Sequence, residues 1–248
     1  MKMNHSIVIL IVIVLFLQCS TCSQPGRSAT SGHSDPTLPV VSSFLAGGQY
    51  VLLTFSNGPH SELTPKFLDI LSNYSVHATF FVFGQKGLIN KDLLQRMVKE
   101  GHEIGQQGFY PKIMRIPHIE PSWLGRTVNV TTRQLAEVIN KEVRYFRSLG
   151  PNNLDIGKMV HSVTGMRSIS WSIDVTDKLG RLRSQYGKPQ EIVDYIMAKA
   201  VPGSIILAYD THPLWLEILP LLLQSLIAGG FECLTVSEMM SFPDDAPH

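Results

Sequence analysis

The stretch Val51–Pro59, VLLTFSNGP, predicts a short buried strand that ends abruptly at small polar residues. An apolar run of this length, bounded by a Gly-Pro turn signal, is typical of a fully buried strand. The last side chains of such a strand usually face a site, yet Ser56 and Asn57 are neither strong acids or bases nor strong metal ligands. What they do there depends on the rest of the sequence.

Strand-like and helix-like segments alternate beyond this point. We expect strands at 51–55, 78–83, 102–105, 167–173, 204–209 and 231–236, and helices from 64, from 90, and over 132–149, 191–200 and 214–228. Thr64 and Asn90 are the expected N-caps. Residues 111–121 are expected to form a proline-broken loop.

Mostly continuous apolar strands separated by helices favour parallel pairing, with the helices outside the sheet. About six or seven such units predict an α/β fold, a distorted parallel (β/α) barrel. An open doubly wound sheet is the alternative. In both folds the functional residues lie at the carboxyl ends of the strands, where the sequence has Ser56-Asn57, Gln106-Gln107, Asp174, Asp177 and Tyr209-Asp210.

The sequence divides into a leader and one large domain. Residues 1–23 carry an apolar run of eleven residues that fits a cleaved secretory signal, with an uncleaved anchor as the alternative. Residues 24–48 are expected to form a flexible leader, 49–241 the domain and 242–248 a tail. Two Asn-X-Ser/Thr triplets suit an exported protein and predict sugar on Asn73 or Asn129 if the host glycosylates. We therefore expect secretion to the outside of the cell or the cell wall, with no membrane span left after cleavage.

Charge and cysteine content narrow the function classes. The 21 basic and 20 acidic residues give a net charge of +1, which argues against nucleic acid or an anionic membrane as the main partner. Of three cysteines, Cys19 and Cys22 lie near the expected cleavage point, so Cys233 is predicted to be a buried, inert thiol.

Six segments in order resemble the polysaccharide deacetylase family, the NodB-homology domain that includes chitin deacetylases. They are VLLTFSNGP, HATFFVFG, MVKEGHEIGQQ, ISWSIDVTD, GSIILAYD and GGFECLTVSEM. The resemblance runs from about residue 49 to 240. It implies a distorted β/α barrel that removes acetyl groups from a sugar polymer. It also implies a divalent metal, usually zinc, held by one Asp and two His, with a second Asp as general base and a His as general acid.

The sequence departs from the family pattern at each of these positions. TFDDGP is the family sequence where Ser56 (base position) and Asn57 (metal position) stand here, and the two metal histidines fall on Gln107 and Pro111. The general-acid histidine falls on Tyr209, whereas Leu207, Asp210, Trp171 and Asp174 match the family. The arginine-proline segment, expected between 150 and 165, is missing there. We therefore predict no intact catalytic set and no bound metal.

Two functions follow from this pattern. The first is a catalytically degenerate, secreted protein that binds chitin-like or other N-acetylated polysaccharide or a cell-wall component. Its expected contacts are Leu207, Tyr209, Asp174, Tyr110 and Trp123. The alternative is an active chitin or peptidoglycan deacetylase with an atypical site, which would need three of His60, His118, His212 and Asp174 or Asp210 around one point.

Overall fold

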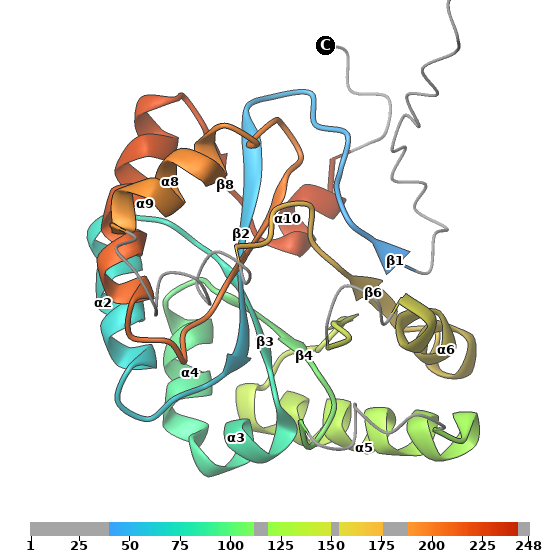
Figure 1. Ribbon diagram of the computed structural model, residues 1–248. Coiled ribbons are helices and arrows are strands. Elements are labelled where there is room, and N and C mark those ends of the chain that lie inside the picture. Colours follow the sequence, from blue (N-terminus) through green and yellow to red (C-terminus); the bar gives the residue numbers. More distant parts are fainter. Residues whose placement is uncertain (1–39, 112–118, 150–153, 176–187, 243–248) are drawn as a thin grey trace, which may run out of the picture. The chain divides into compact units, whose positions relative to one another are not determined.

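The computed structural model describes residues 40–111, 119–149, 154–175 and 188–242 (Figure 1). Its sheet is built around one long strand that carries the sequence quoted above, β2 (Tyr50–Gly58). The other strands are short: β1 (Val40–Val41), β3 (Thr79–Val82), β4 (Glu103–Gln106), β5 (Tyr145–Phe146), β6 (Arg167–Ile169), β7 (Ile205–Ala208) and β8 (Glu232–Cys233).

All strand pairs in the sheet are parallel, in the order β1-β6-β5-β4-β3-β2-β7, with β8 also on β2. The sheet curls until its two sides meet again. Ile173, which follows β6, bridges Ile206 of β7, and Ser43, which follows β1, bridges Ser204 just before β7. The predicted distorted parallel barrel is therefore confirmed as a curled sheet, and the open doubly wound alternative is wrong.

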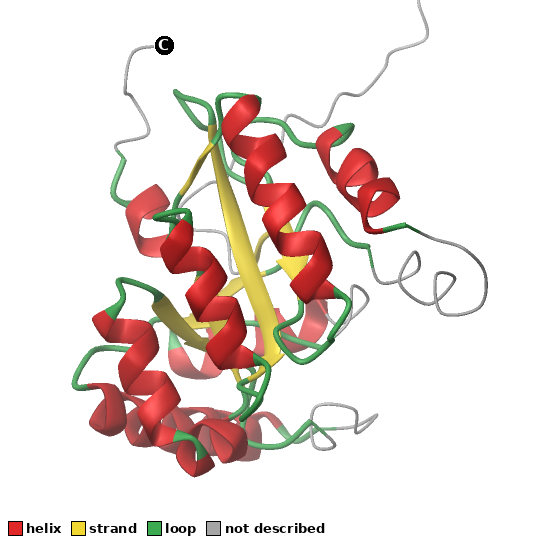
Figure 2. Ribbon diagram, turned by 90° about the vertical axis from the view of Figure 1, so that its left-hand side faces the viewer, coloured by secondary structure: helices red, strands yellow, loops and turns green. Residues whose placement is uncertain are grey.

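The helices lie outside the sheet (Figures 1 and 2). Neighbouring helices contact one another in the order α8, α9, α2, α4, α5, α6, which follows the order of the strands they cover. Their bounds are α2 (Thr64–Asn73), α3 (Gly84–Ile89), α4 (Lys91–Lys99), α5 (Pro121–Ile139), α6 (Leu154–Thr164), α8 (Pro189–Met197), α9 (Trp215–Ala228) and α10 (Val236–Met240). Within the described residues, none of the helices is both long and apolar enough to cross a membrane.

Alternation along β2 separates the two faces of the sheet. Val51, Leu53 and Phe55 join the apolar cluster under the outer helices, whereas Leu52 joins a second cluster inside the curl. Thr54 and Ser56 share the face of Leu52 because side chains in a strand alternate with a period of two. The strand thus delivers two hydroxyl groups to the interior of the curled sheet.

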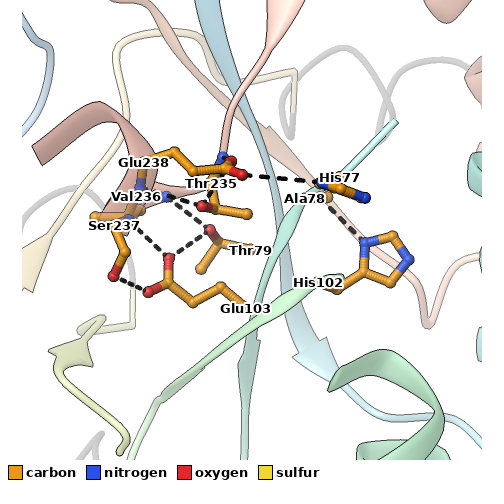
Figure 3. Close-up of polar contacts among 9 residues, drawn as sticks. All are labelled: His77, Ala78, Thr79, His102, Glu103, Thr235, Val236, Ser237 and Glu238. Carbon is orange, nitrogen blue, oxygen red and sulfur yellow. Dashed lines mark hydrogen bonds and ion pairs between the residues drawn. The ribbon is translucent and has the colours of Figure 1, made fainter. Parts of the chain in front are cut away.

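The amino-terminal ends of the strands are fixed by a polar cluster (Figure 3). The carboxylate of Glu103 accepts hydrogen bonds from the hydroxyl of Thr79 and from the backbone N–H and hydroxyl of Ser237. The Thr79 hydroxyl in turn accepts from the N–H of Val236, and Thr235 and Glu238 form a capping box. These contacts anchor α10 on β3 and β4, at the edge opposite Ser56.

Several sequence predictions need correction. The predicted helix 132–149 is wrong, because α5 starts at Pro121 and Asn140 ends it with a left-handed φ of 50°. The two residues Tyr145–Phe146 of that range form β5 instead. Pro121 is at the first turn of a helix, where a missing N–H costs nothing, so the predicted loop ends before it.

Three further predictions need correction at single residues. Thr64 is not an N-cap, because it lies inside α2 and its hydroxyl accepts from the N–H of His60 and donates to Asp210. Asn90 precedes α4 but its side chain makes no cap and instead donates to the carbonyl of Lys86. Val41, placed in the flexible leader, is buried in the sheet next to β6, so the ordered fold starts before residue 49.

Candidate functional site

The residues of interest lie where β2, β4, β5 and β7 end. Ser56 is near the end of β2, and its side chain is buried inside the curl at 2% exposure. The guanidinium of Arg147, which directly follows β5, donates from Nη1 to the hydroxyls of Thr54 (2.8 Å) and Ser56 (3.2 Å). Arg147 also donates to the carbonyls of Ile169 (2.9 Å) and Ser170 (2.9 Å), so it links β2 to the end of β6 across the interior.

This buried cation has an unusual environment. Arg147 is fully buried, its guanidinium lies 4.0 Å from the ring centre of Phe81, and burial lowers its pKa to about 9. None of the ion pairs found within the described residues includes it. The hydrogen bonds that stabilise this buried charge therefore go to neutral hydroxyl and carbonyl oxygens. Arg147 lies ahead of residues 150–165, where the arginine-proline segment of the family pattern was expected, and it is followed by Ser148 and Leu149, not by prolines.

Asn57 and Gln107 bind one another through the backbone of Asn57. The N–H of Asn57 donates to Oε1 of Gln107 over 2.6 Å, and the ammonium of Lys86 donates to the carbonyl oxygen of Asn57 over 2.6 Å. Asn57 adopts a φ of 73°, a conformation that asparagine tolerates better than most residues. Lys86 comes from α3, and burial lowers its pKa while the nearby Asp210 raises it.

Asp210, two residues beyond β7, is the carboxylate of this edge. It is fully buried, and its Oδ2 accepts from the hydroxyl of Thr64 over 2.6 Å. Burial raises its pKa to about 6, against the effects of Thr64 and of Lys86. A Cβ on Gly58 would lie 2.5 Å from Oδ1 and closer still to Oδ2, so the carboxylate can pack there only because residue 58 has no side chain.

The residues at the family metal positions do not suit zinc. Asn57 and Gln107 offer neutral amides, Oε1 of Gln107 is already used by the Asn57 N–H, and Pro111 has no side-chain donor atom. The Lys86 ammonium next to Asn57 and the Arg147 guanidinium next to Ser56 would both repel a cation. Among the described residues, no three His, Cys, Asp or Glu side chains gather closely enough to bind a metal. We derive no catalytic step through a metal.

The histidines proposed for a rebuilt site have local roles. Nδ1 of His60 accepts from the N–H groups of Glu62 and Leu63, and Nδ1 of His212 accepts from the N–H of Leu214. Each ring thus stabilises the turn that leads into a helix, α2 or α9. His118 lies outside the described residues.

The remaining predicted contacts are spread over the same edge. Leu207 is buried in β7, opposite Thr54, and half-buried Tyr209 follows it near enough to Arg147 to raise the pKa of the guanidinium. Asp174 is half-buried and follows Ile173, which bridges β7. Tyr110 and Trp123 are 39% and 37% exposed, and Trp123 lies in the first turn of α5.

Other predicted side chains fit their expected settings. Asn73 and Asn129 are exposed, on α2 and α5. Cys233 is half-buried and not fully buried as predicted, but burial still raises the pKa of its thiol to about 12, which agrees with an inert cysteine. Gln106 is fully buried, and its amide donates to the hydroxyl of Thr132 and to the carbonyl of Val128 on α5. It therefore fixes α5 to the end of β4.

Two residues of this edge, Lys86 and Arg147, were not predicted from the sequence. Arg147 could have been found, because a polar residue directly after an apolar pair follows the same pattern as Ser56 and Asp210. Lys86 carries no such signal, since it comes from a short helix and meets Asn57 only in the folded protein.

Comparisons with known proteins agree with the fold and the segments described above. The profile of the polysaccharide deacetylase family matches residues 46–154. A chitooligosaccharide deacetylase of Bradyrhizobium sp. is 30% identical over 174 residues, which are 68% of this chain and 74% of the relative. The peptidoglycan-N-acetylglucosamine deacetylase PgdA of Listeria monocytogenes is 28% identical over 190 residues, 76% of this chain but only 38% of PgdA.

Among solved structures, a pseudoenzyme of the CE4 family from Bacillus anthracis has the same fold. The TM-score is 0.69 at 21% identity, over 82% of this chain and 69% of that one.

Proposed function

Because the chain belongs to the polysaccharide deacetylase family, we propose that it is a secreted member that binds an N-acetylated polysaccharide without hydrolysing it. The family membership rests on the relatives and the profile given above. The enzymes among these relatives act on chitooligosaccharide and on peptidoglycan, so a glycan of this class is the expected ligand. The Bacillus anthracis protein of the same fold is a pseudoenzyme, so the fold can exist without activity.

One observation carries the proposal. Gln107 and Lys86 hold the backbone N–H and carbonyl of Asn57 through two hydrogen bonds of 2.6 Å, at the edge where the resemblance implies a metal. In this array the Lys86 ammonium takes the place of the metal cation, and the neutral amides of Asn57 and Gln107 take the place of its ligands. Ser56 cannot take a proton near neutral pH, and its hydroxyl is bound by Arg147. The base of the family pattern is therefore missing, and so is a metal that would activate water for hydrolysis.

The exposed aromatic side chains are the expected contacts for sugar. Tyr110 and Trp123 offer ring faces on the surface, and aromatic rings pack well against the apolar faces of sugars. Tyr110 also packs edge-on against Phe109, at a centroid distance of 4.5 Å, which limits the positions of its ring.

Calorimetry with fully N-acetylated chitooligosaccharides tests the binding. We expect saturable binding that Trp123→Ala or Tyr110→Ala weakens about tenfold, the order of about 1.4 kcal/mol. Phe242→Ala, another exposed aromatic but at the carboxyl end of the described residues, is the matched control and should bind as the parent does. Acetate assays run in parallel should show no release above a heat-inactivated sample.

Restoration of single groups should not restore hydrolysis. Ser56→Asp with Asn57→Asp returns two carboxylates, but Gln107 and Pro111 still supply no imidazole. A carboxylate pair alone binds zinc poorly. Acetate release by the parent protein would overturn the proposal in favour of the alternative, an active deacetylase with an atypical site.

A further inference from the structure

A cavity lies at the end of the sheet opposite Ser56, between the turn that follows α2, the helices α9 and α10, and strand β8. Its volume is about 440 Å³, within the range of roughly 300–1,000 Å³ that small-molecule sites occupy. Cys233, one of its lining residues, pairs with Val51, which precedes Asn57 by six residues along β2. At about 3.3 Å per residue, the cavity is roughly 20 Å from the strand ends described above, so it is a separate site.

The lining has a closed aliphatic floor and a mixed outer wall. The floor consists of residues that are at most 9% exposed, namely Val76, Leu223, Leu226 and Leu234. These side chains offer little surface to a ligand. The half-buried Tyr74 and Phe231 add two aromatic rings to the lining, and Ser75 adds an exposed hydroxyl. A wall that combines aromatic rings with polar groups suits a sugar, because such rings pack well against the apolar faces of sugars.

The lining also carries unbalanced negative charge. Glu232 and Glu238 are both exposed, and neither lysine nor arginine stands among the described residues that line the cavity. Nδ1 of His77 lies 3.9 Å from Oε1 of Glu238, which is too long for a hydrogen bond (Figure 3). A cationic ligand would therefore be attracted by two carboxylates, whereas an anionic ligand would be repelled by them.

The carboxylate of Glu238 is held in place through one of its oxygens. Oε2 accepts from the N–H and the hydroxyl of Thr235 over 2.7 and 2.8 Å, as part of the capping box of α10. Oε1 accepts no hydrogen bond from the part of the chain that the structure describes. Because the carboxylate is already oriented, Oε1 can accept from an ammonium at little cost in side-chain entropy.

We propose that this cavity binds a de-N-acetylated hexosamine unit, an amino sugar whose ammonium donates to Oε1 of Glu238. The sugar hydroxyls would bind Ser75 and Glu232, and the apolar face of its ring would pack against Phe231. An N-acetylated unit has a neutral amide in place of the ammonium, so it forms no charge-assisted hydrogen bond with Glu238.

The proposal rests on the proposed function in one respect, the choice of a hexosamine polymer as the ligand. It goes beyond that function because the second site prefers the opposite chemical form of the sugar nitrogen. The strand ends would bind acetylated units, and the cavity at the other end of β2 would bind units that have lost the acetyl group. A partly deacetylated polymer would then be bound more tightly than either uniform polymer, because its two kinds of unit can occupy the two sites.

Three trisaccharides that differ only in the group on the second carbon of each ring test the proposal. They consist of glucosamine, N-acetylglucosamine or glucose units, all joined by the linkage of chitin. Calorimetry and amide NMR of the mature protein should be run at mildly acidic pH, where the sugar amine is protonated. We expect the glucosamine trisaccharide to bind saturably and to shift the amide signals of Ser75, Glu232 and Glu238. The glucose trisaccharide should bind there at least about tenfold more weakly.

Glu238→Gln separates the charge from the fold. Glutamine also forms a capping box, so α10 should keep its start at Thr235. The affinity for the glucosamine trisaccharide should fall about tenfold or more, the loss expected for a hydrogen bond between charged groups. Ile227→Trp, at an exposed position of the lining, should fill the cavity and weaken binding as well. Glu62→Gln, an exposed carboxylate outside the cavity, is the matched control and should bind as the parent does.

The outcomes distinguish this proposal from the proposed function. Equal affinity for the glucosamine and glucose trisaccharides would overturn the amino-sugar site, as would unchanged binding of the glucosamine trisaccharide by Glu238→Gln. The N-acetylated trisaccharide should respond to Trp123→Ala and not to Glu238→Gln. If only the N-acetylated trisaccharide binds, the amino-sugar site is wrong and the proposed function stands. If only the glucosamine trisaccharide binds, with the loss in Glu238→Gln, the proposed function is wrong and the amino-sugar site stands.

Discussion

The Nη1 atom of Arg147 lies 3.2 Å from the hydroxyl of Ser56, and this contact joins the end of β5 to the end of β2 inside the curled sheet. The guanidinium is fully buried with only neutral partners, a costly arrangement for a charge. The first prediction follows from this unbalanced charge.

We predict that Ser56→Asp is more stable than Ser56→Asn. The aspartate would pair with Arg147, whereas asparagine of nearly the same size offers no charge. The difference in the free energy of unfolding at pH 7 should be about 1–3 kcal/mol, the value of a hydrogen bond to a charged group. Urea denaturation of the two variants measures it, and an equal or lower stability of Ser56→Asp would contradict the account.

We predict that Gly58→Ala destabilises the fold and that shortening Asp210 rescues it. The new methyl group would lie 2.5 Å from Oδ1 of Asp210 and closer still to Oδ2, so the strand end or the carboxylate must move. We expect a loss of about 2–4 kcal/mol, in the range of severe overpacking. In a double-mutant cycle with Asp210→Ala, additive effects would show that the two residues do not meet as described.

We predict that His102 makes the protein sensitive to mild acid. Burial lowers its pKa to about 4 in the folded state, from an ordinary 6.5, and Nδ1 accepts from the N–H of Ala78. Between pH 6.5 and pH 4 the unfolded state binds more protons at His102 than the folded state does. The free energy of unfolding therefore falls as the pH falls through this range, by about 3 kcal/mol in total.

His102→Gln should lack this loss. Asp210, with its pKa raised to about 6, has the opposite slope, but it is present in both proteins and cancels in their difference. Unfolding free energies of parent and variant at pH 7 and pH 4.5 provide the comparison. If the difference in unfolding free energy between the parent and His102→Gln is the same at both pH values, His102 is protonated to the same extent in the folded and unfolded states, which contradicts the prediction.

We predict that Glu103 anchors the carboxyl-terminal helix. Its carboxylate accepts three hydrogen bonds, from Thr79 and from two groups of Ser237 (Figure 3). Glu103→Ala should lower the unfolding free energy by about 2–3 kcal/mol and increase hydrogen exchange in α10 before the rest of the fold. Glu62→Ala, at an exposed position, is the control. Unchanged exchange in α10 would mean that the helix is held by its apolar contacts alone.

Some elements of the fold could be predicted from the sequence, and others could not. The long apolar strand, the apolar helix α9 and the parallel curled sheet were predicted because each has a strong local pattern. Strand β5 was not, because two residues are too few for a period of two, and Val143 and Phe146 continue the helical spacing of Leu135 and Ile139. The left-handed Asn140 was the signal that ended the helix.

The site was predicted only where its residues are part of strand ends. Ser56, Asn57, Gln107 and Asp210 were placed correctly because parallel strands end at a common edge. Arg147 was missed because its strand was missed. The Asn57–Lys86 and Thr64–Asp210 contacts join residues 29 and 146 positions apart, and no local pattern contains them.

The metal content of the folded protein tests the central claim most directly. The claim is that a hydrogen-bonded array of Asn57, Gln107 and Lys86 has replaced a zinc site at the strand ends. Freshly purified mature protein should be equilibrated with a small excess of zinc, dialysed and analysed for metal. We predict far less than one zinc per protein molecule. About one tightly held zinc per molecule would contradict the account.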